Sequence, residues 1–188
     1  MGPQPPQSMK SMKIAIIGSS HSNNEEIIKK SREVGRLLAL KGHIIVTGGV
    51  SGYPDIVALS ALSLGGKAVA YCAGKNINDH HKFYKTNLSK YSDRIFQKNY
   101  IENKLSKIDL YLRSLKLCFD VDAAIVIGGR VGTMYELAIL AGIKKDTYVL
   151  SGSGGITNKT IKGFSDEGHK EKSKIEYFNS IKDIEKYL

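Results

Sequence analysis

A glutamate follows a glycine-rich turn that is suited to holding an anion. The turn, GGRVGT at residues 128–133, comes directly after the apolar run Ala123–Ile127. Apolar residues then recur at helical spacing up to Gly142, so the pattern predicts a buried strand, a turn and a helix. Glycine amides and a helix N-terminus attract phosphate. The candidate phosphate-binding residues here are Gly128, Gly129, Arg130, Val131, Gly132 and Thr133.

Glu136 stands in the first turn of this predicted helix and has two interpretations. Thr133 and Glu136 match the spacing of a capping box, in which both side chains bond to free N–H groups at a helix start. Alternatively, the carboxylate lies beside the sugar of a bound nucleotide. There it can stabilise an oxocarbenium-like centre, act as a nucleophile or activate water.

Arg113 precedes the central strand and also has two interpretations. It can pair with Asp109, four residues earlier, on the surface of a helix. It can instead use its planar guanidinium to hold a phosphate or to orient a carboxylate. Asp79, His80 and His81 are neighbours in a polar stretch, but no further ligand cluster joins them. We therefore expect no metal site and no cofactor.

Two further turns rich in glycine or serine follow predicted strands. One comes after Lys13–Gly18 and the other after residues 43–47. The carboxyl ends of parallel strands meet at one sheet edge, so all three turns are expected to line one nucleotide-binding cleft. Ligand-free strand-to-helix turns are the structural alternative. Neither a dinucleotide fingerprint nor a P-loop is present. The added candidates are Gly18, Ser19, Ser20, Gly48, Gly49 and Gly52.

The elements that would position these turns follow from the rest of the pattern. A helix is expected to start at Asn23 or Asn24 and to end at residues 41–42; a second spans 55–64, and a strand follows at 67–72. Residues 13–72 thus alternate β-α-β-α-β, which is typical of a doubly wound, mostly parallel sheet in a Rossmann-like, three-layer α/β domain. Further expected elements are a polar loop or irregular helix at 73–92, a strand at 93–97, a helix at 100–119, strands at 147–150 and 175–178, and a helix from residue 180.

Composition narrows the class of protein. The chain has 188 residues and a net charge of +10, and we expect one domain over residues 13–188 after a disordered lead or expression-tag remnant at 1–12. No apolar run is long enough to span a membrane. Two cysteines in apolar contexts favour reduced thiols and a cytoplasmic location. The basic charge is spread along the chain, which favours a solvated lysine-rich surface over nucleic-acid binding.

Residues 128–136, GGRVGTMYE, resemble the PGGxGTxxE motif of the LOG (Lonely Guy) proteins, a Rossmann-like nucleotide-binding family long labelled putative lysine decarboxylases. Arg113, Asp122 and the TGGVSG segment at 47–52 fall in register with other conserved features of that family. The resemblance covers about residues 13–150, and the loop is most similar to a small branch with an IGGGxGT-type sequence. Gly128 and Arg130 stand where typical members carry proline and glycine.

The resemblance implies hydrolysis of the N-glycosidic bond of a nucleoside 5′-monophosphate to free base and (deoxy)ribose 5-phosphate, in a homodimer or larger homo-oligomer. Arg113 and Glu136 would be the catalytic pair. Residues 132–137, GTMYEL, are also similar to the segment around the glutamate nucleophile of nucleoside 2-deoxyribosyltransferases, which implies N-glycosidic transfer as an alternative. A non-catalytic nucleotide sensor or carrier is another. A DNA-binding relative, similar to bacterial DNA-processing proteins, is supported by charge alone.

Overall fold

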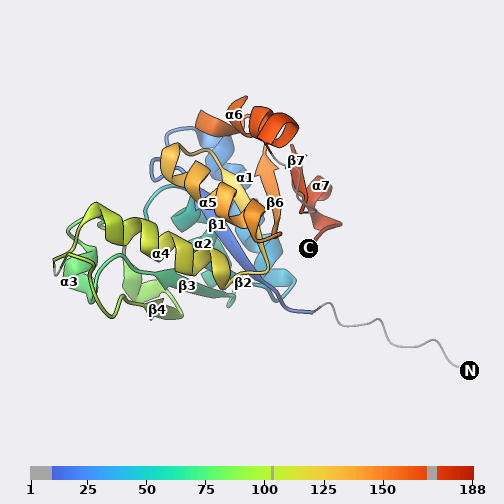
Figure 1. Cartoon of the computed structure of the whole chain (residues 1–188). Helices are drawn as coiled ribbons and strands as arrows, with labels where there is room; N and C mark the ends of the chain where they lie inside the picture. Colours follow the sequence, from blue (N-terminus) through green and yellow to red (C-terminus); the bar gives the residue numbers. More distant parts are fainter. Residues whose placement is uncertain (1–9, 103, 169–172) are drawn as a thin grey trace, which may run out of the picture.

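The fold is built on a sheet of seven strands, all paired in parallel. The computed structural model describes residues 10–102, 104–168 and 173–188 (Figure 1). Most of the expected lead lies outside these residues, and Met12 already packs against the core. The expected doubly wound α/β sheet is confirmed. Its strand order is β4 (Asp93–Ile95), β3 (Lys67–Tyr71), β2 (Ile44–Thr47), β1 (Lys13–Gly18), β5 (Ala123–Ile127), β6 (Asp146–Leu150) and β7 (Ile175–Phe178).

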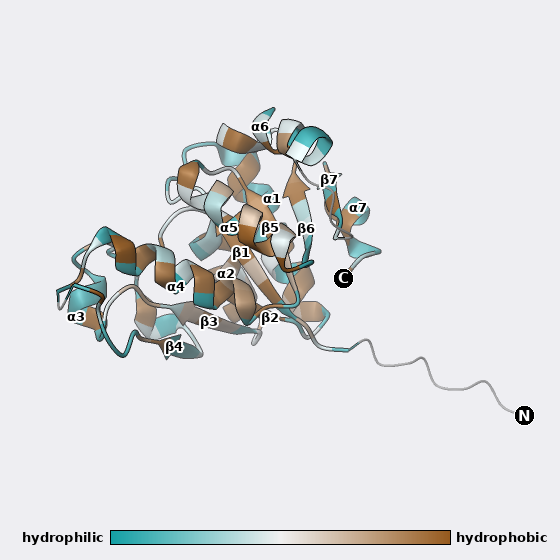
Figure 2. Cartoon of the chain, viewed as in Figure 1, coloured by the Kyte–Doolittle hydropathy of each residue, from teal (hydrophilic) through white to brown (hydrophobic). Residues whose placement is uncertain are grey.

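Helices cover both faces of the sheet, which explains why its central strands are apolar throughout. Side chains alternate between the faces: Ile14 and Ile16 of β1 join one core cluster, and Ala15 and Ile17 join the other. In Figure 2 the central strands are mostly brown, that is, hydrophobic. One face carries α1 (Glu25–Leu40), α2 (Tyr53–Leu62) and α7 (Ile181–Glu185); the other carries α4 (Lys107–Phe119), α5 (Val131–Gly142) and α6 (Thr160–Gly163).

The helix starts show which local signals decided the structure. Asn24, one of the two expected caps, accepts hydrogen bonds from the backbone N–H groups of residues 26 and 27. The helix expected at 100–119 begins only at Lys107, so that prediction was wrong at its start. Ser106 and Asp109 form a capping box there, and the apolar residues before it are outside the helix. None of the helices in the described parts of the chain is long and apolar enough to cross a membrane.

The long segment at 73–92 contains a short helix, α3 (Ile77–His80), and a 3-10 turn, η1 (Leu88–Lys90). Two more short elements, η2 (Gly155–Thr157) and η3 (Phe164–Gly168), follow β6. From β1 the chain winds outward through β2 and β3 to β4, and α4 then returns it to β5 on the other side of β1. The strand order therefore reverses between β1 and β5. Such a reversal opens a crevice beyond the carboxyl ends of the two strands, where open α/β sheets bind ligands.

Candidate functional site

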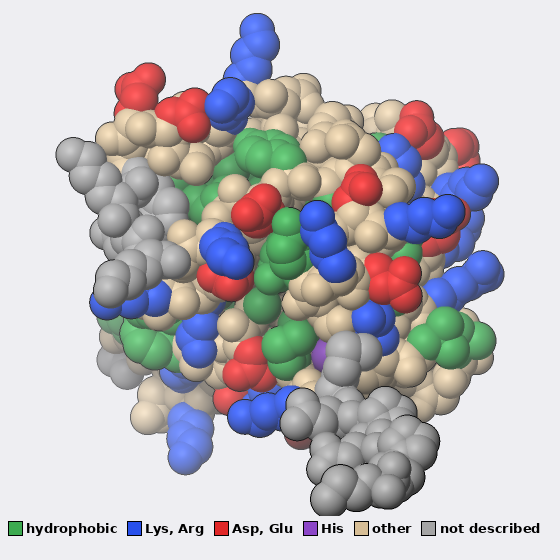
Figure 3. Space-filling view, turned by 90° about the vertical axis from the view of Figure 1, so that its right-hand side faces the viewer, with side chains coloured by type: hydrophobic (Ala, Val, Ile, Leu, Met, Phe, Trp, Pro, Cys, Tyr) green, Lys and Arg blue, Asp and Glu red, His purple; other side chains and the backbone are tan. Residues whose placement is uncertain are grey.

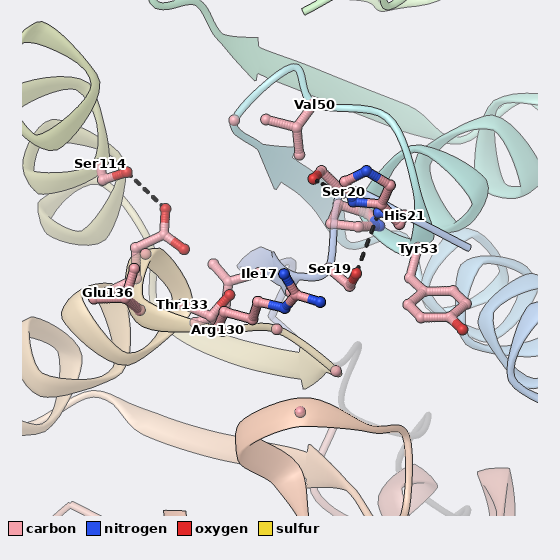
Figure 4. A pocket seen from close by; sticks show the side chains of 18 of the residues that line it. Ile17, Ser19, Ser20, His21, Val50, Tyr53, Ser114, Arg130, Thr133 and Glu136 are labelled. Atoms are coloured by element: carbon pink, nitrogen blue, oxygen red, sulfur yellow. Dashed lines mark hydrogen bonds between the residues drawn. The ribbon is translucent and has the colours of Figure 1, made fainter. Parts of the chain in front are cut away.

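A cavity of about 600 Å³ lies at this reversal, beyond the carboxyl ends of β1, β2 and β5 (Figure 4). The three turns singled out in the sequence meet around it. The candidate residues that line it are Gly18, Ser19, Ser20, Gly48, Arg113, Gly128, Gly129, Arg130, Val131, Gly132, Thr133 and Glu136. Gly49 and Gly52 are not among the lining residues. Sequence spacing thus located the cleft, although two glycines of the second turn do not face it.

Gly52 instead joins the second turn to the first. Its φ of 85° is one that favours glycine, and a Cβ there would overlap the backbone of Ser19 and Ser20. The N–H of Tyr53 donates to Ser19 O at 3.1 Å, and Ser51 Oγ donates to Ser20 O at 3.0 Å. The two turns are therefore packed into one wall of the cavity.

The turn after β5 and a loop that the sequence did not flag lie together on the cavity wall and make a candidate anion subsite. Helix α5 begins at Val131, so its first backbone N–H groups have no partner within the helix. The exposed Arg130 stands at the N-cap and adds a positive charge. Ser153 accepts a hydrogen bond from Gly128 N at 2.8 Å and lines the cavity with Gly154 and Gly155. These features suit a phosphate group.

Glu136 does not cap its own helix. Because α5 starts at Val131, Thr133 already lies in the helix and the expected capping box does not form. The carboxylate instead accepts a hydrogen bond from Ser114 Oγ of α4 at 2.7 Å, which Figure 4 shows across the cavity wall. Burial raises the pKa of Glu136, while the Arg113 charge and the Ser114 hydrogen bond act in the opposite direction. Glu136 is thus an oriented carboxylate of increased basicity.

Arg113 is buried, with 5% of its surface exposed, so the alternative interpretation of a surface pair with Asp109 is wrong. Asp109 is itself buried and caps α4. The Nη1 group of Arg113 donates to Gly48 O at 2.5 Å and to Tyr71 O at 3.4 Å. A Cβ at Gly48 would overlap the guanidinium, so only glycine permits this approach. Arg113 Nε has no hydrogen-bond partner among the described residues.

Several lining residues were missed at the level of sequence. Ser114 follows Arg113 directly, and its burial on the inner face of α4 became evident only from the structure. Phe83 and Tyr84 are adjacent aromatic residues in the polar segment 73–92, which was a usable signal, and Tyr111 lies on α4.

Cys72 and Cys118 are buried free thiols. Across the described residues, no group of three or more His, Cys, Asp or Glu side chains is placed to hold a metal.

A parallel three-layer sheet with a cavity at its strand-order reversal defines a Rossmann-like domain of the nucleotide-binding type. Within that class, the model of the SLOG cluster4 family matches residues 11–184, and the chain belongs to this family. The SLOG superfamily has the LOG-like Rossmann fold, so the resemblance to the LOG proteins is confirmed at this level.

The chain is also similar to several individual proteins. An uncharacterized protein from Archaeoglobus fulgidus is 29% identical over 133 residues, covering 70% of this chain and 74% of the relative. Among solved structures, TM1055 has a TM-score of 0.73 at 21% identity, covering 94% of this chain and 99% of its own. The molybdenum cofactor binding protein from Rippkaea orientalis has a TM-score of 0.70 at 16% identity, with 95% and 96% covered. DNA processing protein A from Helicobacter pylori, described as binding single-stranded DNA, has a TM-score of 0.70 at 18% identity, with 96% and 81% covered. These structural similarities show the fold alone.

Proposed function

We propose that the protein hydrolyses the N-glycosidic bond of a nucleoside 5′-monophosphate and releases free base and (deoxy)ribose 5-phosphate. The observation that carries the proposal is the placement of Glu136 relative to the anion subsite. Glu136 follows Val131, the first residue of α5, by five positions, which is about 7.5 Å along a helix axis. That separation is comparable with the reach from the phosphate to C1′ of a nucleotide. A phosphate at the helix start would therefore bring the glycosidic carbon to the carboxylate.

The residues of the cavity supply the chemistry that this reaction needs. The ionised Glu136 would stabilise the oxocarbenium-like centre at C1′ and accept a proton from the attacking water. The departing base would take up a proton from solvent, and Glu136 would then return its own proton to solvent. Ser114 would keep the carboxylate in one orientation. Arg113 would help to keep it ionised, and its unpartnered Nε leaves a donor for a substrate oxygen. Arg130 and the N–H groups of α5 would hold the phosphate.

The test is incubation of the purified protein with a panel of ribo- and deoxyribonucleoside monophosphates, with chromatography for released base. We expect Glu136→Gln to lower turnover by ~10²- to 10⁴-fold, because the amide cannot take a proton or stabilise a cation. Its melting temperature and nucleotide binding should persist. Glu185→Gln, an exposed position of α7, is the matched control and should keep full activity.

Three results would redirect the proposal. Undiminished release by Glu136→Gln would refute the catalytic role of that residue. Release that requires a second base as acceptor would favour N-glycosidic transfer. No release from any nucleotide that binds would favour a sensor or carrier, a function supported by the fold of the molybdenum cofactor binding protein.

Nucleic-acid binding has weaker support. Figure 3 shows Lys and Arg side chains mixed with Asp and Glu on the face around β7 and α7, with no continuous basic patch there.

We also propose that the protein forms a homodimer or larger homo-oligomer. The outer face of α4 carries a stripe of apolar residues at helical spacing: Ile108, Leu112, Leu115 and Phe119. Phe119 is 62% exposed and Ile108 is 44% exposed. A contiguous exposed apolar stripe of this kind is typical of a protein–protein contact. A second copy of the chain would cover it.

A further inference from the structure

Two pairs of aromatic side chains line the cavity. Phe83 and Tyr84 come from the segment after α3, Tyr111 comes from α4, and Tyr135 comes from α5. Tyr111 and Tyr135 meet edge to face with their ring centroids 5.0 Å apart. Phe83 is 38% exposed and Tyr111 is 43% exposed, so these rings are not core residues. Exposed aromatic rings at a cavity indicate that a ligand covers them.

The segment that carries Phe83 and Tyr84 is held in place by polar contacts. His80 is fully buried; its Nδ1 accepts from Ala73 N at 3.1 Å, and its Nε2 therefore donates to Gly49 O at 2.9 Å. Asp79 accepts from Tyr100 Oη at 2.6 Å, and Tyr100 in turn accepts from Lys75 N at 2.8 Å. A polar segment of this length in a compact domain is usually functional. Here it is fixed to the β2 turn and presents two rings to the cavity.

The place of these rings relative to Glu136 gives the subsite its identity. Tyr111 lies one helical turn before Ser114, which bonds to Glu136, and Tyr135 precedes Glu136 directly. We propose that Phe83, Tyr84 and Tyr111 form a subsite that stacks on the base of a nucleoside monophosphate. The ligand class rests on the proposed function, with the phosphate at the α5 start and C1′ at Glu136. The base then extends toward α4.

The aromatic surface of this subsite predicts which bases it accepts. Phe83, Tyr84, Leu110 and Tyr111 offer flat or apolar surface, and Lys107 also lines the cavity. Stacking tolerates every base because each has a π face. The subsite therefore accepts all bases, with purines bound more tightly than pyrimidines because their ring area is larger.

The experiment compares a nucleotide with the same phosphosugar lacking its base. Titration calorimetry measures the binding of AMP, CMP and ribose 5-phosphate to the Glu136→Gln protein, and chromatography after each titration checks that the AMP is still intact. Adding Tyr111→Ala or Phe83→Ala should weaken AMP binding by roughly 5- to 150-fold, the scale of one base–aromatic stack. Ribose 5-phosphate binding should stay unchanged. Tyr177→Ala, a similarly exposed ring in β7 outside the cavity, should alter neither ligand.

Three outcomes would overturn the base subsite. They are AMP binding no tighter than ribose 5-phosphate in the parent protein, AMP binding unchanged by both alanine variants, and an equal loss for both ligands, which indicates a structural effect. The result is separate from catalysis. If the wild type releases no base and Tyr111→Ala weakens the binding of AMP alone, the base subsite is supported and the hydrolase proposal is refuted. If the wild type releases base and neither alanine variant changes the KM for AMP, the hydrolase proposal is supported and the base subsite is refuted.

Discussion

The buried His80 should make the protein less stable in mild acid. Burial is the main cause that lowers the pKa of His80 from 6.5 to about 4, the charges of Arg113 and His81 lower it further, and the hydrogen bond to Gly49 O opposes them. Protonation would also remove the Nδ1 acceptor of the Ala73 N–H group. In the unfolded chain, by contrast, the imidazole is free to take up its proton near its ordinary pKa.

The sign and size of the effect follow from these two pKa values. Between about pH 6.5 and 4 the unfolded state binds a proton at His80 that the folded state does not bind, so the free energy of unfolding falls as the pH falls. Above that interval the stabilisation is fully present. At ~1.4 kcal/mol for each pKa unit, the loss attributable to His80 is about 3 kcal/mol. This is a large part of the free energy of unfolding of a typical domain, which is about 5–15 kcal/mol.

Urea denaturation at a series of pH values from 7 to 4 measures this effect. Other groups titrate in the same interval, including Glu136 and Asp55, whose pKa values are raised by burial. The informative quantity is therefore the stability of the wild type minus that of His80→Gln, which should shrink by about 3 kcal/mol over the series. A difference that is constant with pH would refute the reasoning.

Two further predictions follow from the contacts of α4. Ser114→Ala removes a hydrogen bond that lowers the pKa of Glu136. The acid limb of the profile of kcat against pH should therefore move to higher pH. An acid limb that does not move, together with an unchanged kcat, would exclude the orienting role of Ser114. Phe119→Glu places a charge in the exposed apolar stripe of α4 and should shift an oligomer to monomer in light scattering without lowering the melting temperature of the monomer; a wild type that is monomeric at high concentration would contradict the proposed assembly.

The strands were predictable because their signal is local. Runs such as Ala123–Ile127 are apolar throughout, glycines follow them, and a sheet covered on both faces requires this pattern. The turns after β1 and β5 could be placed together for the same reason, since parallel order fixes which ends of the strands meet. No distant contact was needed for either inference.

Helix α4 was harder to predict because its apolar stripe lies on its exposed side, whereas its buried side mixes apolar and polar residues. Arg113 and Ser114 are buried with Leu117 and Cys118, whereas Phe119 is exposed. Hydrophobic periodicity therefore identified a helix, extended it too far toward the N-terminus and gave no sign that a polar side faces the cavity. Glu136 was ambiguous for a related reason. Its partner lies 22 residues away on another helix, beyond the reach of a local motif.

The two sides of α4 differ in what changes they can tolerate over evolution. Substitutions on the outer stripe would alter only the proposed assembly, while Tyr111, Arg113 and Ser114 stay in place. An inserted or deleted residue within the helix has a different effect, because it turns everything beyond it by about 100° and moves it about 1.5 Å. Such a change ahead of Arg113 would withdraw the guanidinium from Gly48 O and the hydroxyl from Glu136 in one step. The number of residues between Lys107 and Ser114 should therefore vary far less than the identities of the residues on the outer stripe.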